Sequence, residues 1–129
     1  MKRVEMTIDF KSSLEKVFNV VSNLNDCSWR SDLLKVEQLS EDKYLEYNRK
    51  NRVTKVRIVT QIENIQFEYD LQNDSYTGHW CGQFASLKDG GCRLYLSFYF
   101  EPSTLLGEFV NGEKFLQRYI EDLKKELAE

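Results

Sequence analysis

The expected fold is decided by residues 103–129, STLLGEFVNGEKFLQRYIEDLKKELAE. Their apolar side chains recur at spacings of three, four or seven, which places them on one face of an α-helix. The stripe consists of Leu105, Phe109, Leu116, Ile120, Leu123 and Leu127, widened by Leu106, Phe115 and Tyr119. Ser103 or Thr104 is the expected N-cap, because a hydroxyl oxygen can accept from a free N–H group of the first turn. The sequence therefore predicts one long amphipathic helix over residues 103–129, which needs a broad apolar surface to lie on.

The rest of the chain predicts a sheet that supplies this surface. Residues 2–10 alternate apolar and polar side chains, which is typical of a strand with one buried face. A short helix is expected next, ending near Ser22, with Ser12 or Ser13 as its N-cap. The two-residue period then returns in strands expected near residues 34–39, 44–49, 54–62, 65–71, 76–87 and 92–101.

These elements predict an α+β fold made of one domain over residues 1–129. An antiparallel sheet commonly faces water on one side and must be covered on the other. The C-terminal helix is the only expected element long enough to cover it. We therefore expect a curved antiparallel sheet that wraps around the long C-terminal helix. Within the strand over residues 54–62, Val56, Ile58, Thr60 and Ile62 are expected to share one face.

Composition excludes several classes of function. A net charge of −3 with interspersed acids and bases favours no nucleic-acid partner. No apolar run approaches the roughly 20 residues of a membrane span, and the charged N-terminus has no apolar signal-peptide core. The cysteine residues Cys27, Cys81 and Cys92 are odd in number and lack a C-x-x-C spacing, which favours a reduced, cytoplasmic protein. The sequence leaves the oligomeric state open.

Several local segments carry a resemblance to a known family. They are residues 13–21 (SLEKVFNVV), residues 23–26 (NLND) leading to Trp29, residues 90–94 (GGCRL) and residues 100–107 (FEPSTLLG). In this order they resemble the SRPBCC superfamily, the START-like helix-grip proteins, and are nearest to its polyketide cyclase/dehydrase and coenzyme Q-binding branches. The chain departs from the family pattern at Ser12-Ser13, where a proline is usual, and at Cys92, where a threonine is usual.

The resemblance implies that a small hydrophobic ligand binds between the sheet and the C-terminal helix. The ligand classes it implies are lipids, isoprenoids and aromatic or polyketide-like molecules, with no cofactor. The residues expected to contact the ligand are Trp29, Tyr69, Gly78, Trp80, Gly82, Phe84, Leu96, Phe98, Phe109 and Leu116. Gly78 and Gly82 flank Trp80 on the expected inner face, and glycine in a strand marks missing volume or close approach. Either they open a pocket beneath the helix, or they make room for the indole ring.

No catalytic or metal site is predicted, because the superfamily shares no catalytic motif. His79 is the only histidine, which excludes a His-based metal cluster. Strand parity places it on the outer face if Trp80 and Phe84 point inward, and a slip of one residue in register would reverse this. The binding of such a ligand favours a non-enzymatic carrier or sensor. Two alternatives to this function stay open. One is a cyclase- or dehydratase-like enzyme that uses pocket tyrosines as acids and needs at least two convergent polar residues. The other is a protein-binding module that docks a partner on Tyr95 and Tyr99.

Overall fold

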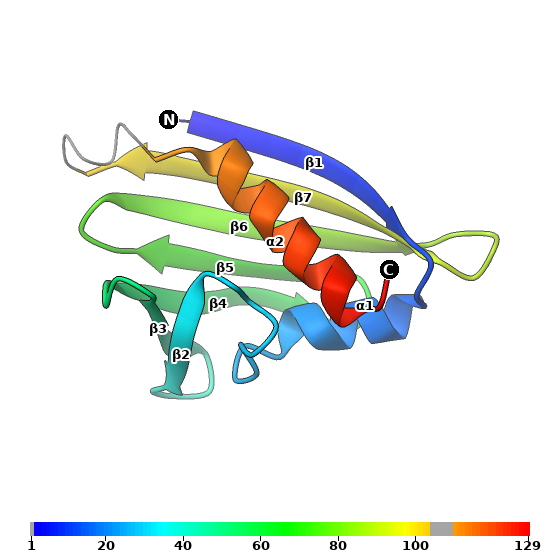
Figure 1. Cartoon of the computed structure of the whole chain (residues 1–129), viewed down its shortest axis with the longest axis horizontal. Coiled ribbons are helices and arrows are strands. Elements are labelled where there is room, and N and C mark those ends of the chain that lie inside the picture. The colour runs from blue at the N-terminus through cyan, green and yellow to red at the C-terminus, as the bar shows by residue number, and fades with distance from the viewer. Residues whose placement is uncertain (1, 104–109) are drawn as a thin grey trace.

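The computed structural model describes residues 2–103 and 110–129 (Figure 1). In chain order the elements are β1 (Lys2–Phe10), α1 (Leu14–Ser22), β2 (Leu33–Gln38), β3 (Lys43–Asn48), β4 (Val53–Ile62), β5 (Gln66–Gln72), β6 (Tyr76–Ser86), β7 (Cys92–Pro102) and α2 (Gly112–Glu126). Ser13 caps α1, since its hydroxyl accepts from the Lys16 backbone N–H at 3.3 Å.

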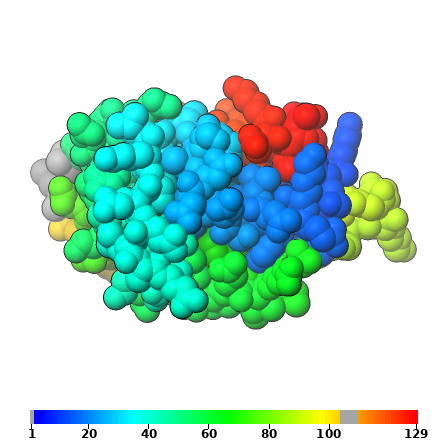
Figure 2. All heavy atoms as spheres, turned by 90° about the horizontal axis from the view of Figure 1, so that it is seen from below, coloured from blue at the N-terminus to red at the C-terminus, as the bar shows by residue number. Residues whose placement is uncertain are grey.

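The seven strands form one antiparallel sheet in the order β1-β7-β6-β5-β4-β3-β2. Strands β2 to β7 are consecutive neighbours, and β1 closes the other edge by pairing with β7. Helix α2 crosses the inner face of this sheet (Figure 1). Seen from below, the blue atoms, which include α1, and the cyan atoms, which include β2, lie side by side on one face of the molecule (Figure 2). The predicted helix-grip architecture is confirmed.

The core lies between α2 and the inner face of the sheet. Trp80 on β6 has no exposed surface, and the Tyr69 ring from β5 stacks on it with centroids 4.9 Å apart. Tyr119 from α2 covers the same indole at 5.5 Å, while Leu116 and Leu123 of α2 are fully buried. The apolar stripe of the C-terminal helix therefore faces the sheet, as the spacing predicts.

The start of the C-terminal helix differs from the prediction. Helix α2 begins at Gly112, and the Asn111 side chain accepts from the Lys114 backbone N–H at 3.0 Å as its N-cap. Ser103 is not the cap of α2, since Asn111 has that place, and the Ser103 N–H bonds to the Ser75 carbonyl at 2.8 Å beyond the end of β7. The alternative cap Thr104 and the expected stripe residues Leu105, Leu106 and Phe109 lie outside the described residues. Asparagine is one of the preferred N-cap residues, and here it marks the start of α2.

The face assignment along β4 also differs from the prediction. Ile58 pairs with Tyr69 on the inner face, but the register shifts before Thr60, which pairs with Glu68. This bulge inserts one unpaired residue and reverses the parity that follows. Thr60 and Ile62 therefore lie on the outer face, not with Val56 and Ile58, and Ile62 is 48% exposed.

Candidate ligand-binding site

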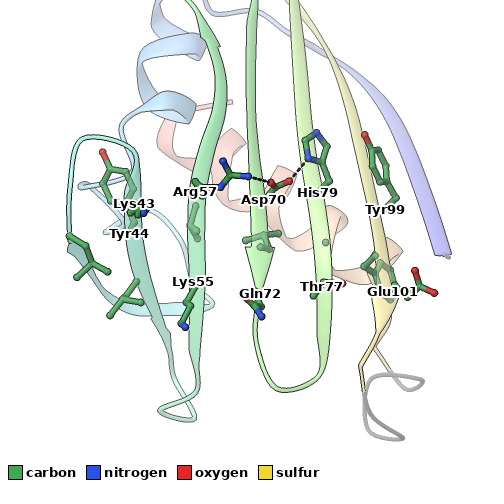
Figure 3. A pocket seen from close by; sticks show the side chains of 16 residues that line it. Lys43, Tyr44, Lys55, Arg57, Asp70, Gln72, Thr77, His79, Tyr99 and Glu101 are labelled. Carbon is green, nitrogen blue, oxygen red and sulfur yellow. Dashed lines mark hydrogen bonds and ion pairs between the residues drawn. The ribbon is translucent and has the colours of Figure 1, made fainter.

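The larger hollow in the molecule is a trough of about 910 Å³ on the outer face of the sheet (Figure 3). Two rows of side chains from β3 to β7 flank it. One row is Lys43, Arg57, Asp70, His79 and Tyr99, and the other is Leu45, Lys55, Gln72, Thr77 and Glu101. The trough is therefore an open, water-facing surface that mixes charged groups with apolar ones such as Leu39 and Phe100.

His79 is held in place at one side of this trough. Its Nδ1 lies 2.7 Å from Asp70 Oδ1 and its Nε2 lies 2.7 Å from Glu68 Oε2, while Arg57 pairs with Asp70 at 2.9 Å. The imidazole also stacks on Tyr99 with centroids 5.0 Å apart. The outward orientation expected for His79 is confirmed. Arg57 and Asp70, which lie opposite each other on β4 and β5, form a cross-strand ion pair beside it. Partial burial lowers the pKa of His79, but hydrogen bonds to Asp70 and Glu68 outweigh it and raise the pKa.

This pKa shift predicts a pH-dependent contribution to stability. A raised folded-state pKa stabilises the fold fully below the unfolded value of 6.5, and the contribution fades as pH rises through the folded value. We expect His79→Gln to lower the free energy of unfolding by up to about 1 kcal/mol near pH 5.5, and by less near pH 9. Urea denaturation at both pH values measures this, with Thr77→Val on the same strand as a non-titrating control. A loss that is equal at both pH values would contradict the prediction.

The second hollow is a cavity of about 350 Å³ on the inner side of the sheet, and we refer to it as the grip cavity. It lies between strands β3 to β7 and the N-terminal half of α2. Its apolar and aromatic wall consists of Leu33, Val53, Tyr69, Leu71, Tyr76, Phe98, Val110 and Phe115. Most of the basic side chains that line it, Arg49, Lys50 and Arg52, come from the β3–β4 turn. Acidic and neutral polar residues line it as well, among them Asp32, Glu46 and Asn73. The grip cavity therefore combines an apolar wall with several polar and charged groups, and small-molecule sites also pair apolar surface with polar groups.

A buried cluster of charges lies at the grip cavity. Arg30 is 5% exposed and binds Asp32 through two hydrogen bonds, of 2.9 and 2.8 Å. Glu46, on the inner face of β3, is 8% exposed and lies 3.9 Å from Arg30 between Oε2 and Nη1. The guanidinium of Arg30 also lies 5.0 Å from the centroid of the Tyr119 ring. Asp32 and Glu46 line the grip cavity, and Arg30 lies behind them.

Burial raises the pKa values of three acidic groups that line the grip cavity. Desolvation raises the pKa of Glu46, and the positive charge of Arg30 offsets only part of the increase. Burial likewise raises the pKa of Tyr69 well above its usual value and that of Tyr76 to about 12. Both phenols therefore stay protonated at neutral pH, so they are available as hydrogen-bond donors.

The structure distributes the predicted ligand residues among different places. Tyr69 and Phe98 line the grip cavity, and Gly78 lines the outer trough. Trp29 lines two small hollows of about 230 and 10 Å³ and packs edge-to-face on Tyr119. Five of the predicted ligand residues are buried in the core and line none of these hollows: Trp80, Gly82, Phe84, Leu96 and Leu116. Phe109 lies outside the described residues.

The space beside the two strand glycines is occupied by aromatic rings. A Cβ atom on Gly82 would lie 3.0 Å from Cη2 of Trp80, and one on Gly78 would lie 3.1 Å from Cε1 of Phe98. Of the two interpretations of these glycines, the structure favours the one in which they make room for rings. A ligand role for Gly78, Trp80 and Gly82 stays a prediction.

Sequence reasoning missed Glu46, Arg30 and Tyr119 as residues of the site. A signal for Glu46 was present, because it has the same strand parity as Tyr44, whose side chain is buried. A carboxylate at an inner-face position is rare without a partner. Arg30 follows Trp29 in a turn segment with no periodicity, so its burial could not be inferred.

Two features are absent from the described residues. They contain no group of three or more His, Cys, Asp or Glu side chains that could hold a metal ion. Within residues 2–103 and 110–129, no helix is long and apolar enough to cross a membrane.

Comparisons with known proteins find similarity in structure but not in sequence. No family model and no curated protein matches the chain. A START superfamily protein from Mycobacterium smegmatis superposes with a TM-score of 0.86 at 14% identity, covering 98% of this chain and 97% of that one. A conserved protein from Geobacillus kaustophilus gives 0.83 at 11% identity, covering 98% and 95%.

A two-domain protein from a biosynthetic pathway shows the same structural similarity. The di-domain ARO/CYC protein StfQ from the steffimycin biosynthetic pathway gives a TM-score of 0.76 at 13% identity, covering 95% of this chain and 43% of that one. The strand order, the covering helix and these superpositions agree over nearly the whole chain. The chain has the START-like, helix-grip fold of the SRPBCC proteins.

Proposed function

We propose that this protein binds a small, largely apolar molecule in the grip cavity, as a carrier or sensor. The observation that carries the proposal is the cavity of about 350 Å³, which lies between the sheet and α2 and has an aromatic and aliphatic wall. Its volume falls within the range of about 300–1,000 Å³ that is usual for small-molecule sites. The START-like neighbours support the same general role, since their fold is a ligand-binding one. Lipids, isoprenoids and aromatic or polyketide-like molecules suit such a wall.

The outer trough suits an apolar molecule less well, although it is larger. Its walls carry Lys55, Arg57, Asp70 and Glu101, and Arg57 and Asp70 already pair with each other. An apolar ligand in the trough would have to desolvate these charges without replacing their interactions. The grip cavity also carries charges, among them Asp32, Glu46 and Arg118, but it is the more enclosed of the two hollows and lies beneath α2. A bound apolar molecule would therefore be removed further from water there than in the trough.

The proposal is tested by blocking the cavity. Val110 lines the cavity, so Val110→Trp is expected to fill part of it. Val59, 47% exposed on the β4 bulge, lines neither hollow, so Val59→Trp is the matched control. We expect the neutral dye prodan, followed by its fluorescence, to bind wild type and Val59→Trp alike, and Val110→Trp at least about tenfold more weakly.

Native mass spectrometry of protein purified without detergent adds an independent measurement. A retained small molecule would appear as excess mass in wild type, and would be lost on denaturation and absent from Val110→Trp. Equal prodan binding by all three proteins, or none by wild type, would contradict the proposal.

The buried carboxyl group also supports a second candidate, a cyclase- or dehydratase-like enzyme. Glu46 and Tyr69 are two polar residues that line the grip cavity, and the candidate requires at least two polar groups there that converge on the substrate. A desolvated carboxyl group beside an apolar substrate is suited to general acid–base chemistry. Turnover of a poly-β-ketone substrate by wild type but not by Glu46→Gln would favour this candidate over a carrier.

A further inference from the structure

Glu46 is a buried carboxyl group that lacks a hydrogen bond. Its side chain is 9% exposed, and it lies on the inner face of β3 opposite Thr54 of β4. The closest charge is the Arg30 guanidinium at 3.9 Å, beyond hydrogen-bond distance, and both hydrogen bonds of Arg30 go to Asp32. In the part of the chain that the structure describes, no group donates a hydrogen bond to Glu46. Buried carboxyl groups are almost always hydrogen-bonded. The Glu46 oxygens are not among the described side-chain atoms that are sealed from solvent without a partner, so they face open space.

The position of Glu46 explains what its carboxyl group can reach. It lines both the grip cavity and the adjoining void of about 10 Å³, with Leu33 as a second shared residue. The void has room for about one water molecule at most. The grip cavity is the larger space, so its occupant is the group that can complete the hydrogen bonding of Glu46.

We propose that Glu46 is the polar anchor of the grip cavity and accepts a hydrogen bond from a hydroxyl or N–H group of the bound molecule. This inference rests on the proposed function and names the chemical group that the cavity recognises. A carboxyl oxygen accepts hydrogen bonds in either protonation state, and an ionised carboxylate only accepts. A ligand that supplies a donor therefore satisfies Glu46, whereas one that supplies only an acceptor leaves an ionised Glu46 unpaired.

The rest of the wall defines the body of this ligand. Leu71, Phe98 and Phe115 line the same cavity and offer apolar and aromatic surface. Tyr69 adds a ring that is already fixed by stacking on Trp80. The ligand class is therefore a flat or aliphatic apolar body with one hydrogen-bond donor, such as a phenol, a long-chain alcohol or a ring N–H.

Three ligands with one ring system separate donor recognition from simple apolar binding. They are 2-naphthol, which donates, 2-methoxynaphthalene, which only accepts, and 2-methylnaphthalene, which does neither. We expect calorimetry to show that wild type binds 2-naphthol about tenfold or more tightly than the other two, the effect of one hydrogen bond to a charged group. In Glu46→Met this preference is expected to fall to about twofold or less, with 2-methylnaphthalene bound at least as tightly as by wild type.

Two further variants make the result specific to Glu46. Glu46→Gln keeps a carbonyl acceptor at the same place and is expected to retain part of the preference. Glu37→Met removes an exposed carboxylate from the opposite face of the sheet and is expected to retain all of it. Thermal unfolding of each variant shows whether the fold is intact.

Each contrary outcome overturns a different statement. Equal binding of 2-naphthol and 2-methoxynaphthalene by wild type would overturn donor recognition, as would be found if one water molecule satisfies Glu46. A full preference retained by Glu46→Met would overturn the role of Glu46. In both cases binding of 2-methylnaphthalene leaves the proposed function standing. Failure of all three ligands and of prodan to bind would overturn both proposals.

Discussion

Trp80→Ala is expected to lower the free energy of unfolding by about 3–5 kcal/mol, the usual cost of truncating a large buried aromatic side chain. The indole has no exposed surface, and the rings of Tyr69 and Tyr119 lie 4.9 and 5.5 Å from it. Gly82 provides no side chain that could fill the space, and strands on both sides hold β6 in register. The surrounding core therefore cannot collapse around the missing ring.

Urea denaturation followed by far-UV circular dichroism measures this loss. Tyr95→Ala is the control, because Tyr95 is an aromatic residue of β7 that is 43% exposed. We expect the control to cost about 1 kcal/mol or less. Similar losses in the two variants would contradict the central role of Trp80 in the core.

Arg30→Met is also expected to destabilise the protein by about 3–5 kcal/mol, because it removes one partner of a buried charge cluster. Arg30 is 5% exposed and forms two hydrogen bonds with Asp32. Without it, Asp32 loses both of these bonds and Glu46 loses the positive charge 3.9 Å away. Methionine keeps most of the volume of the arginine alkyl stem, so the loss in free energy of unfolding reflects the missing charge more than missing volume.

Acid should reduce the cost of Arg30→Met. Burial already raises the pKa of Glu46, and loss of Arg30 raises it further, so this carboxyl group becomes neutral at a higher pH in the variant. The difference from wild type in free energy of unfolding is therefore expected to be smaller near pH 5 than near pH 8. Denaturant titrations at both pH values test this.

Two companion variants separate charge from packing at Arg30. Arg30→Met combined with Asp32→Leu is expected to recover part of the lost stability, because an apolar pair can replace a buried ion pair. Arg52→Met, at an exposed position on the β3–β4 turn, should change stability by about 0.5 kcal/mol or less. No recovery in the double variant, with an equal loss at both pH values, would assign the effect of Arg30 to packing alone.

The sequence by itself determined the architecture. Alternating side chains in seven segments and one apolar stripe near the C-terminus sufficed for an antiparallel sheet covered by a helix, because these periods decide which faces are buried. The outward orientation of His79 followed from the same parity, since β6 is regular from Tyr76 to Ser86. Such features depend on neighbours in the chain, which the sequence shows directly.

Only the tertiary structure decided the details that make the site. The bulge in β4 reverses Thr60 and Ile62 because of its pairing with β5, and alternation along one strand cannot reveal such a shift. Whether Gly82 opens a pocket depends on the Trp80 side chain, which turns toward it. Glu46 meets Arg30 because the strand β3 and the turn before β2 fold onto the same end of the grip cavity. Burial and hydrogen bonding depend on contacts between distant segments, and these exist only once the chain has folded.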